Sequence, residues 1–193
     1  TAEEEVDFNV KIDSAGNAVT VGWVYSQSTG YDMLMRKYDR TGRLLWTATY
    51  DGPAHGDEFF GSLAIDANDN IITCGTSPGV GGDADITTLK YTPNGQLAWT
   101  RRYYGPAGGS DHTFGIEAVG LDSAGRIYVC GYSIAADSVF EFVTIKYSTA
   151  GSPLWVRRYR GPQDNSYAWV IAVSPSGNAY VGGDVSNLNG DRD

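Results

Sequence analysis

The ten residues DSAGRIYVCG, at positions 122–131, combine a tight polar turn with a short run of β-forming residues. The same pattern recurs at 13–22, at 66–75 and, in altered form, at 174–183. In the first three copies, a lysine follows the turn aspartate after 24 residues and a proline follows it after 40. A sequence that repeats itself at about 50 residues predicts a fold built from repeated supersecondary units.

Each unit is predicted to contain four short antiparallel strands, because apolar residues alternate and turn residues interrupt them. In the second unit these strands are 62–66, 71–75, 86–91 and 97–103. Tight turns join the first strand to the second and the third to the fourth, and they require residues with positive φ. Asp69 is expected to adopt this conformation at a modest cost. The glycines expected to adopt it are Gly16, Gly42, Gly95, Gly125 and Gly151.

Four antiparallel strands in about 50 residues are typical of a β-propeller blade. We therefore predict an all-β fold, a β-propeller made of four-stranded antiparallel blades, with about three and a half blades present. The expected units are 1–53, 54–106, 107–162 and a half-blade at 163–193. Because propellers close with roughly four to eight blades, we expect this chain to be part of a longer chain or of a self-assembling homo-oligomer.

The third unit continues with further motifs after its opening stretch. These are TIKY at 144–147, Gly151, Trp155 and YRGP at 159–162. The whole pattern resembles the SBBP-type bacterial β-propeller repeat, and the resemblance extends over essentially the whole chain. Asp69 and Ser174, which replace a turn glycine and a turn aspartate, are small departures. The resemblance implies a secreted or cell-surface bacterial protein, and it brings no catalytic residues with it.

The composition argues against several classes of partner. The chain has 14 basic and 23 acidic residues and a net charge of −9, which would repel nucleic acids and anionic membranes. No run of 18 apolar residues is present, so membrane insertion is not expected. The 25 glycines and 13 tyrosines suit short strands and tight turns better than long helices.

Two motifs that could bind a ligand have a structural explanation as well. Trp46, Trp99 and Trp155 could bind a sugar or an anion, but their recurrence in every unit favours a role in locking adjacent blades. Residues 66–70 (DANDN) resemble the start of a calcium loop. The glutamate that this motif requires is absent from the expected position, so a hairpin turn is favoured.

The cysteines and histidines do not form a recognisable site. Cys74 and Cys130 occupy equivalent places in neighbouring units, about 10 Å apart, which exceeds the reach of a disulfide. Two buried thiols are therefore expected. His55 and His112 lie in connectors of different units without a third ligand, so they are expected to be solvated loop residues. We predict no metal, no cofactor and no catalytic residues.

A ligand is most expected on the face formed by two kinds of loop. These are the connectors between units and the loops between the second and third strands, which vary in length and are rich in aromatic residues. A carbohydrate or a protein is the expected ligand. The alternative is that these rings only plug the channel and seal the blade junctions. The candidate residues are Trp23, Tyr25, His55, Phe59, His112, Phe114, Tyr132 and Tyr167.

The function predicted from the sequence is that of a non-catalytic extracellular binding or scaffold module, not an enzyme. One alternative is a fragment of a quinoprotein-like or other propeller enzyme, because TGRLLW at 41–46 is similar to the docking segment of quinoprotein dehydrogenases. Another alternative is a purely structural spacer of a large surface protein. A propeller fold does not by itself decide among these functions.

Overall fold

Four antiparallel sheets make up the protein, which was studied as a computed structural model describing residues 4–161 and 165–185. The first sheet contains β1 (Glu5–Ile12), β2 (Ala18–Ser26), β3 (Gly30–Tyr38) and β4 (Leu44–Tyr50). The second contains β5 (Phe59–Ile65), β6 (Ile71–Pro78), β7 (Ala84–Tyr91) and β8 (Leu97–Tyr103). The third contains β9 (Asp111–His112), β10 (Val119–Leu121), β11 (Ile127–Ile134), β12 (Phe140–Tyr147) and β13 (Pro153–Tyr159). The fourth contains β14 (Ser166–Val173) and β15 (Ala179–Val185).

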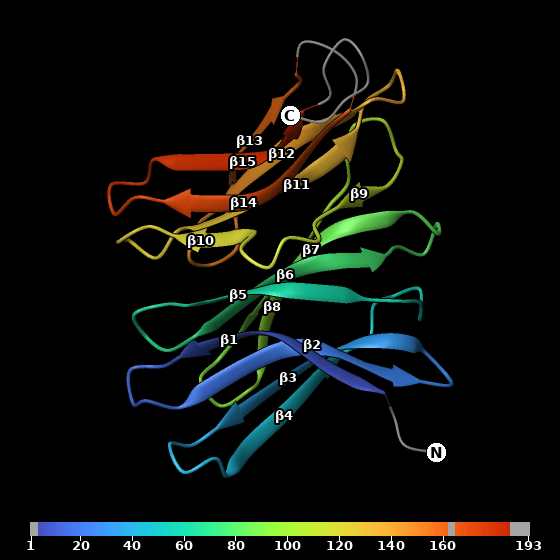
Figure 1. Ribbon diagram of the computed structural model, residues 1–193. Helices are drawn as coiled ribbons and strands as arrows, with labels where there is room; N and C mark the ends of the chain where they lie inside the picture. Colours follow the sequence, from blue (N-terminus) through green and yellow to red (C-terminus); the bar gives the residue numbers. More distant parts are fainter. Residues whose placement is uncertain (1–3, 162–164, 186–193) are drawn as a thin grey trace.

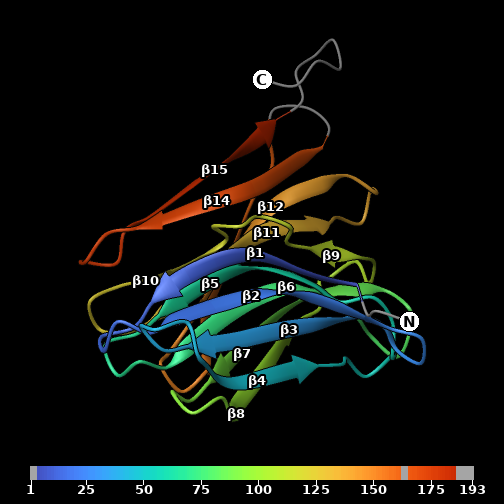
Figure 2. The same ribbon diagram turned by 60° about the horizontal axis from the view of Figure 1, so that its bottom comes forward.

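The sheets are stacked in sequence order (Figure 1). Within each sheet consecutive strands pair with one another, except that β9 pairs with β11. The first strands of neighbouring sheets contact one another: β1 with β5, β5 with β10, and β10 with β14 (Figure 2). This arrangement confirms the prediction of an all-β, propeller-like fold, and the blade number stays a prediction. None of the described residues forms a helix, so no helix in this part of the chain could span a membrane.

The predicted strands of the second unit are confirmed with changes at their ends. β8 has the predicted limits, whereas β5 begins three residues earlier because Phe59 and Phe60 pair with Thr76 and Gly75. β6 extends to Pro78 and β7 begins at Ala84, because Ser77 and Pro78 pair with Asp85 and Ala84. The predicted unit limits stay predictions, and the last of them, at 162/163, lies outside the described residues.

The third sheet departs from the others in its first strand. Here that strand is divided into β9 and β10, and residues 113–118 lie between the two pieces. The connector leading to this sheet is three residues longer than the preceding one, since it spans 16 residues from proline to turn aspartate where the second sheet has 13. We call residues 113–118 the insert. It matters for the candidate site described below.

The turns between paired strands adopt the predicted conformation. All five predicted glycines have positive φ, and Asp69 has φ 59°. Asp69 also has a function that glycine lacks: its carboxylate accepts hydrogen bonds from the amide and the hydroxyl of Ser14, at 2.9 and 2.5 Å. Because Ser14 belongs to the β1–β2 turn, this aspartate links the first sheet to the second, and the link offsets the backbone strain.

The 24-residue spacing from aspartate to lysine corresponds to a buried ion pair in each of the first three sheets. The Lys Nζ to Asp Oδ2 distance is 2.8 Å for Lys37–Asp13 and 2.9 Å for Lys90–Asp66. The Asp66 carboxylate also accepts hydrogen bonds from Asn68 and Asn70. Residues 66–70 therefore form the predicted hairpin turn, with the aspartate turned inward.

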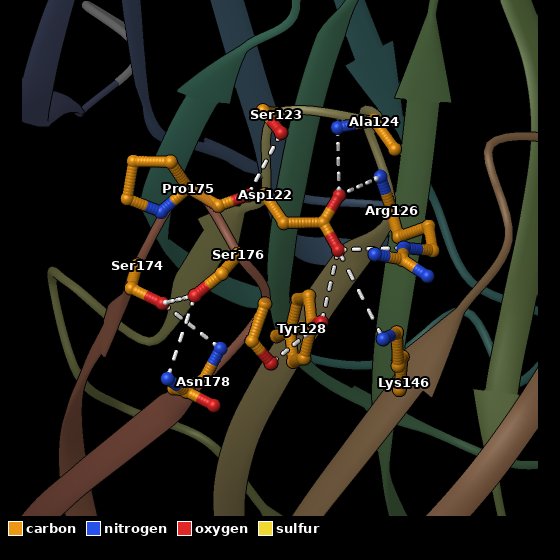
Figure 3. A network of polar contacts seen from close by, with 11 residues as sticks. Asp122, Ser123, Ala124, Arg126, Tyr128, Lys146, Ser174, Pro175, Ser176 and Asn178 are labelled. Carbon is orange, nitrogen blue, oxygen red and sulfur yellow. Dashed lines mark hydrogen bonds and ion pairs between the residues drawn. The ribbon is translucent and has the colours of Figure 1, made fainter.

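The third and fourth sheets are joined at the same turns (Figure 3). Asp122 accepts hydrogen bonds from Arg126 at 2.6 Å and from the Tyr128 hydroxyl at 3.0 Å, while Lys146 lies 3.9 Å away. Ser123 donates from its amide and its hydroxyl to the Pro175 carbonyl in the next turn, at 3.1 and 2.8 Å. A hydrogen-bonded contact between neighbouring turns therefore joins the third sheet to the fourth, as it joins the first to the second, although different residues form it.

The repeated tryptophans lock neighbouring sheets together. The Trp46 indole donates a hydrogen bond to the Pro93 carbonyl at 3.1 Å, and its ring packs against Gly95 in the same turn. A Cβ atom at Gly95 would lie 2.8 Å from the ring, so only glycine fits there. Trp99 packs against Gly151 in the same way. This contact is the structural role that the recurrence of the tryptophans predicts.

The core lies between the sheets, in two clusters of buried apolar residues. Cys74 and Cys130 belong to the cluster shared by the second, third and fourth sheets, and both are buried and free. The prediction of two buried thiols is therefore confirmed. Burial raises the pKa of the Cys74 thiol to about 12, so this side chain stays an uncharged thiol at neutral pH.

Candidate functional site

A continuous row of aromatic rings crosses all four sheets, and we call it the aromatic ridge. Neighbouring ring centroids along it are 4.5–6.4 Å apart, the usual spacing of interacting aromatic pairs. Its members are Phe8, Trp23, Tyr25, Tyr31, Phe59, His112, Phe114, Tyr132, Phe140, Tyr167 and Trp169.

Strand pairing explains how residues far apart in sequence meet in this row. Tyr25 in β2 is paired with Tyr31 in β3, so their rings lie on the same face with centroids 5.1 Å apart. In the third sheet, Tyr132 of β11 is paired with His112 of β9, and their rings are 5.3 Å apart. Side chains alternate along a strand, which places every second residue on this face.

The insert lies at the centre of the ridge and is held by three sheets. The Asn9 side chain in β1 donates to the Ile116 carbonyl at 2.5 Å. Thr113 exchanges hydrogen bonds with the Thr76 hydroxyl of β6, at 3.0 and 3.2 Å. The Ile171 amide of β14 donates to the Glu117 carbonyl at 2.9 Å. The backbone of the insert is therefore fixed from both sides, while Phe114, Ile116 and Glu117 remain exposed.

Two apolar hollows flank the insert. The first lies toward the first and second sheets and is lined by Phe8, Trp23, Phe59, Phe60, Gly61, Phe114 and Ile116. The second lies toward the fourth sheet and is lined by Phe114, Gly115, Ile116, Glu117, Trp169 and Val170. Phe114 and Ile116 separate the two, with 45% and 57% of their surfaces exposed. Large apolar side chains exposed together in this way mark binding surfaces.

His112 and Tyr132 are the titratable groups at the centre of the ridge. Burial lowers the pKa of His112, so its imidazole is neutral at neutral pH. Its Nδ1 atom is buried and has no hydrogen-bond partner among the described residues. Burial raises the pKa of Tyr132 to about 12, which keeps this phenol protonated. The ridge thus contains one uncharged nitrogen that can accept a hydrogen bond or a proton.

Seven of the eight candidate residues from the sequence come together in the ridge. His55 does not: it is exposed and its Nδ1 atom lies 2.6 Å from Asp51 Oδ2. Whether the ridge residues bind a ligand stays a prediction.

The sequence analysis missed four members of the ridge, although the repeat register contains a signal for them. Tyr31 and Phe140 both stand one residue before the acidic residue of the third strand. Phe8 and Trp169 both stand five residues before the first residue of the turn.

No protein-family model matches the chain, and no curated protein matches it. The SBBP-type resemblance is therefore not confirmed. Among solved structures, the chain is similar to one described as a new family of polysaccharide lyase, PL25 ulvan lyase, bound to -[GlcA(1-4)Rha3S]-. The TM-score is 0.55 at 13% sequence identity, and the match covers 94% of this chain and 50% of that one. The likeness shows the fold, and this chain spans half the length of that protein.

This comparison corrects one prediction from the sequence. The chain was expected not to be an enzyme, yet the structure that shares its fold is an enzyme. The physical reason for the error is the place of catalytic groups in such folds. They come from loops of different sheets, so a search for compact catalytic motifs along the chain does not exclude them.

Proposed function

We propose that this chain binds a polysaccharide along the aromatic ridge, as part of a protein with a carbohydrate-related function. The observation that carries this proposal is the ridge itself, with exposed Phe8, Phe59 and Phe114 beside the two hollows. Rings of this kind offer flat apolar surfaces on which sugar rings stack, and neighbouring polar groups then fix their orientation. A row that crosses several sheets fits an extended chain of sugars better than a single small molecule.

The repeat supports the same proposal, because the ridge is where its symmetry is broken. The insert has no counterpart in the first and second sheets, and it supplies both Phe114 and Ile116. A role confined to holding sheets together would be served by the same residues in every unit. Residues 113–118 instead present apolar side chains to solvent from a backbone that three sheets hold in place.

The similar structure and the charge of the ridge guide the choice of sugar. That structure is bound to a polysaccharide of glucuronate and sulfated rhamnose. On this chain, however, the residues that line the two hollows include Glu117 and no lysine or arginine. An acidic polysaccharide would lack a cationic partner there, so we propose a neutral polysaccharide. A secreted or surface location and further blades, in a longer chain or a second copy, remain proposals that accompany this function.

Titration of the protein with neutral and acidic polysaccharides by calorimetry tests the proposal. We expect binding to a neutral polysaccharide, and we expect Phe114→Ala to weaken it about tenfold or more. Tyr180→Ala is the matched control, because Tyr180 is an exposed ring of β15 outside the ridge. Binding by Phe114→Ala equal to that of the wild type, or binding to acidic polysaccharides alone, would contradict the proposal.

A second candidate function is chemistry on the bound sugar, and one observation favours it. The neutral His112 imidazole lies among rings that would contact the sugar, and its buried Nδ1 atom has no hydrogen-bond partner in the described part of the chain. A group of this kind is suited to take a proton from a substrate. The experiment is to follow the release of shorter sugar chains by the wild type and by His112→Asn. Release by the wild type that the variant lacks would support catalysis, and equal release by both would contradict a role for His112.

A further inference from the structure

Three carboxylates meet where the first sheet joins the second, next to Tyr31 and Phe59 of the aromatic ridge. Asp32 lies in β3, Asp51 directly follows β4, and Glu58 directly precedes β5. One oxygen of each lies within 4.8 Å of the other two. Asp32 is 9% exposed and Glu58 is fully buried. Such a concentration of negative charge out of water is unfavourable unless a cation accompanies it.

Each carboxylate is anchored through one of its oxygens. The Thr29 hydroxyl donates to Asp32 Oδ2 at 2.7 Å, the Ser77 hydroxyl donates to Glu58 Oε1 at 3.2 Å, and His55 lies 2.6 Å from Asp51 Oδ2. The second oxygens, Asp32 Oδ1 and Glu58 Oε2, are buried and have no hydrogen-bond partner among the described residues. Two buried carboxylate oxygens in one cluster therefore lack the partner that buried charges require.

The second and third sheets each contain an arginine–carboxylate pair that the first sheet lacks. In the second sheet, Arg102 Nη2 lies 2.7 Å from Asp85 Oδ2, and in the third, Arg158 Nε lies 2.8 Å from Glu141 Oε2. Asp85 and Glu141 are the repeat equivalents of Asp32.

The repeat equivalent of the two arginines in the first sheet is Thr49. The first sheet thus keeps the buried acid of the third strand but lacks the cation that neutralises it elsewhere. The additional acid of the first sheet is Asp51, whose repeat equivalents are Tyr104 and Arg160. Glu58 has a counterpart in Asp111, which lies near the arginine-paired Asp85 at the next junction.

We propose that Asp32, Asp51 and Glu58 bind a calcium ion that bridges the first and second sheets. An all-oxygen set of ligands selects a hard cation over zinc or copper. Ligand atoms around Ca²⁺ lie 2.3–2.6 Å from the ion, and so up to about 5 Å from one another, which accommodates this cluster. Mg²⁺ requires ligands at about 2.1 Å in a strict octahedron and fits a cluster of this span less well. Water would complete the shell of the ion.

The electrostatics of the cluster agree with this assignment. Burial, followed by the charges of Asp51 and Asp32, raises the pKa of Glu58 to about 7. Burial also raises the pKa of Asp32. The metal-free site thus disfavours the charged forms of Glu58 and Asp32, and a divalent cation beside them would favour those forms.

A bound ion would also act on the aromatic ridge. Tyr31 precedes Asp32 in β3 and Phe59 follows Glu58, and the two ring centroids are 6.1 Å apart. Fixing the two carboxylates to one ion would fix the relative position of these two rings. This inference does not depend on the proposed polysaccharide, because cation binding is measured without any sugar.

Thermal unfolding and calorimetry with CaCl₂, MgCl₂ and NaCl at equal ionic strength test the proposal. Ca²⁺ at about 100 times its Kd should raise the Tm by about 5 °C or more, and NaCl should not. Asp32→Asn and Glu58→Gln should abolish the calcium effect. Asp137→Asn removes an exposed carboxylate from another loop and should keep it. Absence of a calcium effect in the wild type, or its persistence in Glu58→Gln, would overturn the site.

Thr49→Arg provides a test that does not rely on removing a ligand. It places in the first sheet the arginine that pairs with Asp85 and Glu141 in the others. We expect it to raise the Tm of the calcium-free protein by about 3 °C and to weaken Ca²⁺ binding about tenfold. Unchanged Ca²⁺ affinity in a folded Thr49→Arg variant would contradict the proposed ligand set.

Discussion

The two edges of the stacked sheets differ in how faithfully they repeat. At the edge of the tight turns, the first three sheets share the same aspartate–lysine pair, and tryptophan packs on glycine at the first two junctions. At the edge of the aromatic ridge, the rings vary from sheet to sheet and the insert occurs in the third sheet. Repetition therefore marks the residues that hold the sheets together, and its loss coincides with the residues that we propose to face a ligand.

The largest expected effect comes from breaking one of the repeated ion pairs of the turn edge. Lys90→Met leaves Asp66 as a buried, unpaired carboxylate, because the Lys90 ammonium lies 2.9 Å from it. We expect the free energy of unfolding to fall by about 3–5 kcal/mol in chemical denaturation. The double variant Lys90→Met, Asp66→Asn should recover much of this loss. A loss below about 1 kcal/mol in the single variant would mean that the repeated pair is not a main source of stability.

The same pairs predict how stability depends on acid. Although burial raises the pKa of Asp13, hydrogen bonds from Lys37 and Asn17 outweigh it and lower that pKa to about 2. A lowered carboxyl pKa stabilises the folded protein above pH 4, and this contribution disappears as the pH falls from about 4 toward 2. Stability measured across this range should decline, and Asp13→Asn should flatten the decline. An unchanged slope in the variant would contradict the role given to this pair.

Substitutions at two glycines of the turn edge distinguish the energetic cost of backbone strain from the cost of disturbing the contact between sheets. Gly95 (φ 79°) packs against Trp46, while Gly42 (φ 85°) has open space around its Cα atom. Gly42→Ala should cost about 1 kcal/mol from its φ alone. Gly95→Ala should cost about 1–2 kcal/mol more, because the new methyl group meets the indole ring. Equal losses in the two variants would show that the tryptophan contact does not hold the sheets together.

The smallest expected effect on stability belongs to the aromatic ridge. Phe114 is 45% exposed and lies on the insert, so Phe114→Ala should change the free energy of unfolding by less than about 1 kcal/mol. Chemical denaturation of Phe114→Ala and of Lys90→Met under the same conditions compares their free energies of unfolding. A loss as large as that of Lys90→Met would show that the ridge is part of the core, and the contrast between the two edges would fail.

The sequence was sufficient to predict the repeated part of the molecule. The recurring spacings from Asp66 to Lys90 and to Trp99 reflect contacts made in more than one sheet, so the register alone predicts strands, turns and sheet order. The ridge was predicted in part: Trp23, Phe59 and Tyr132 were expected in variable loops, whereas they lie within β2, β5 and β11. The position of the insert between three sheets could not be predicted, since it depends on the packing of sheets and not on any local pattern.

The acidic cluster was missed for a related reason. Asp32 lies in β3, whereas Asp51 and Glu58 stand at the two ends of the β4–β5 connector, and their spacing matches no known ligand motif. The repeat nonetheless contained a signal for this cluster. Thr49 occupies the repeat position of Arg102 and Arg158, the two arginines that neutralise the acids equivalent to Asp32 in the second and third sheets. The prediction that the chain is not an enzyme failed similarly, since it relied on the absence of compact motifs.

Titration of the wild type and of Phe114→Ala with the same neutral polysaccharide tests the central claim most directly. The contrast between the edges predicts that the variant folds with nearly wild-type stability and loses about tenfold or more in affinity. A variant that binds as tightly as the wild type, or a wild type that binds no polysaccharide, would contradict it.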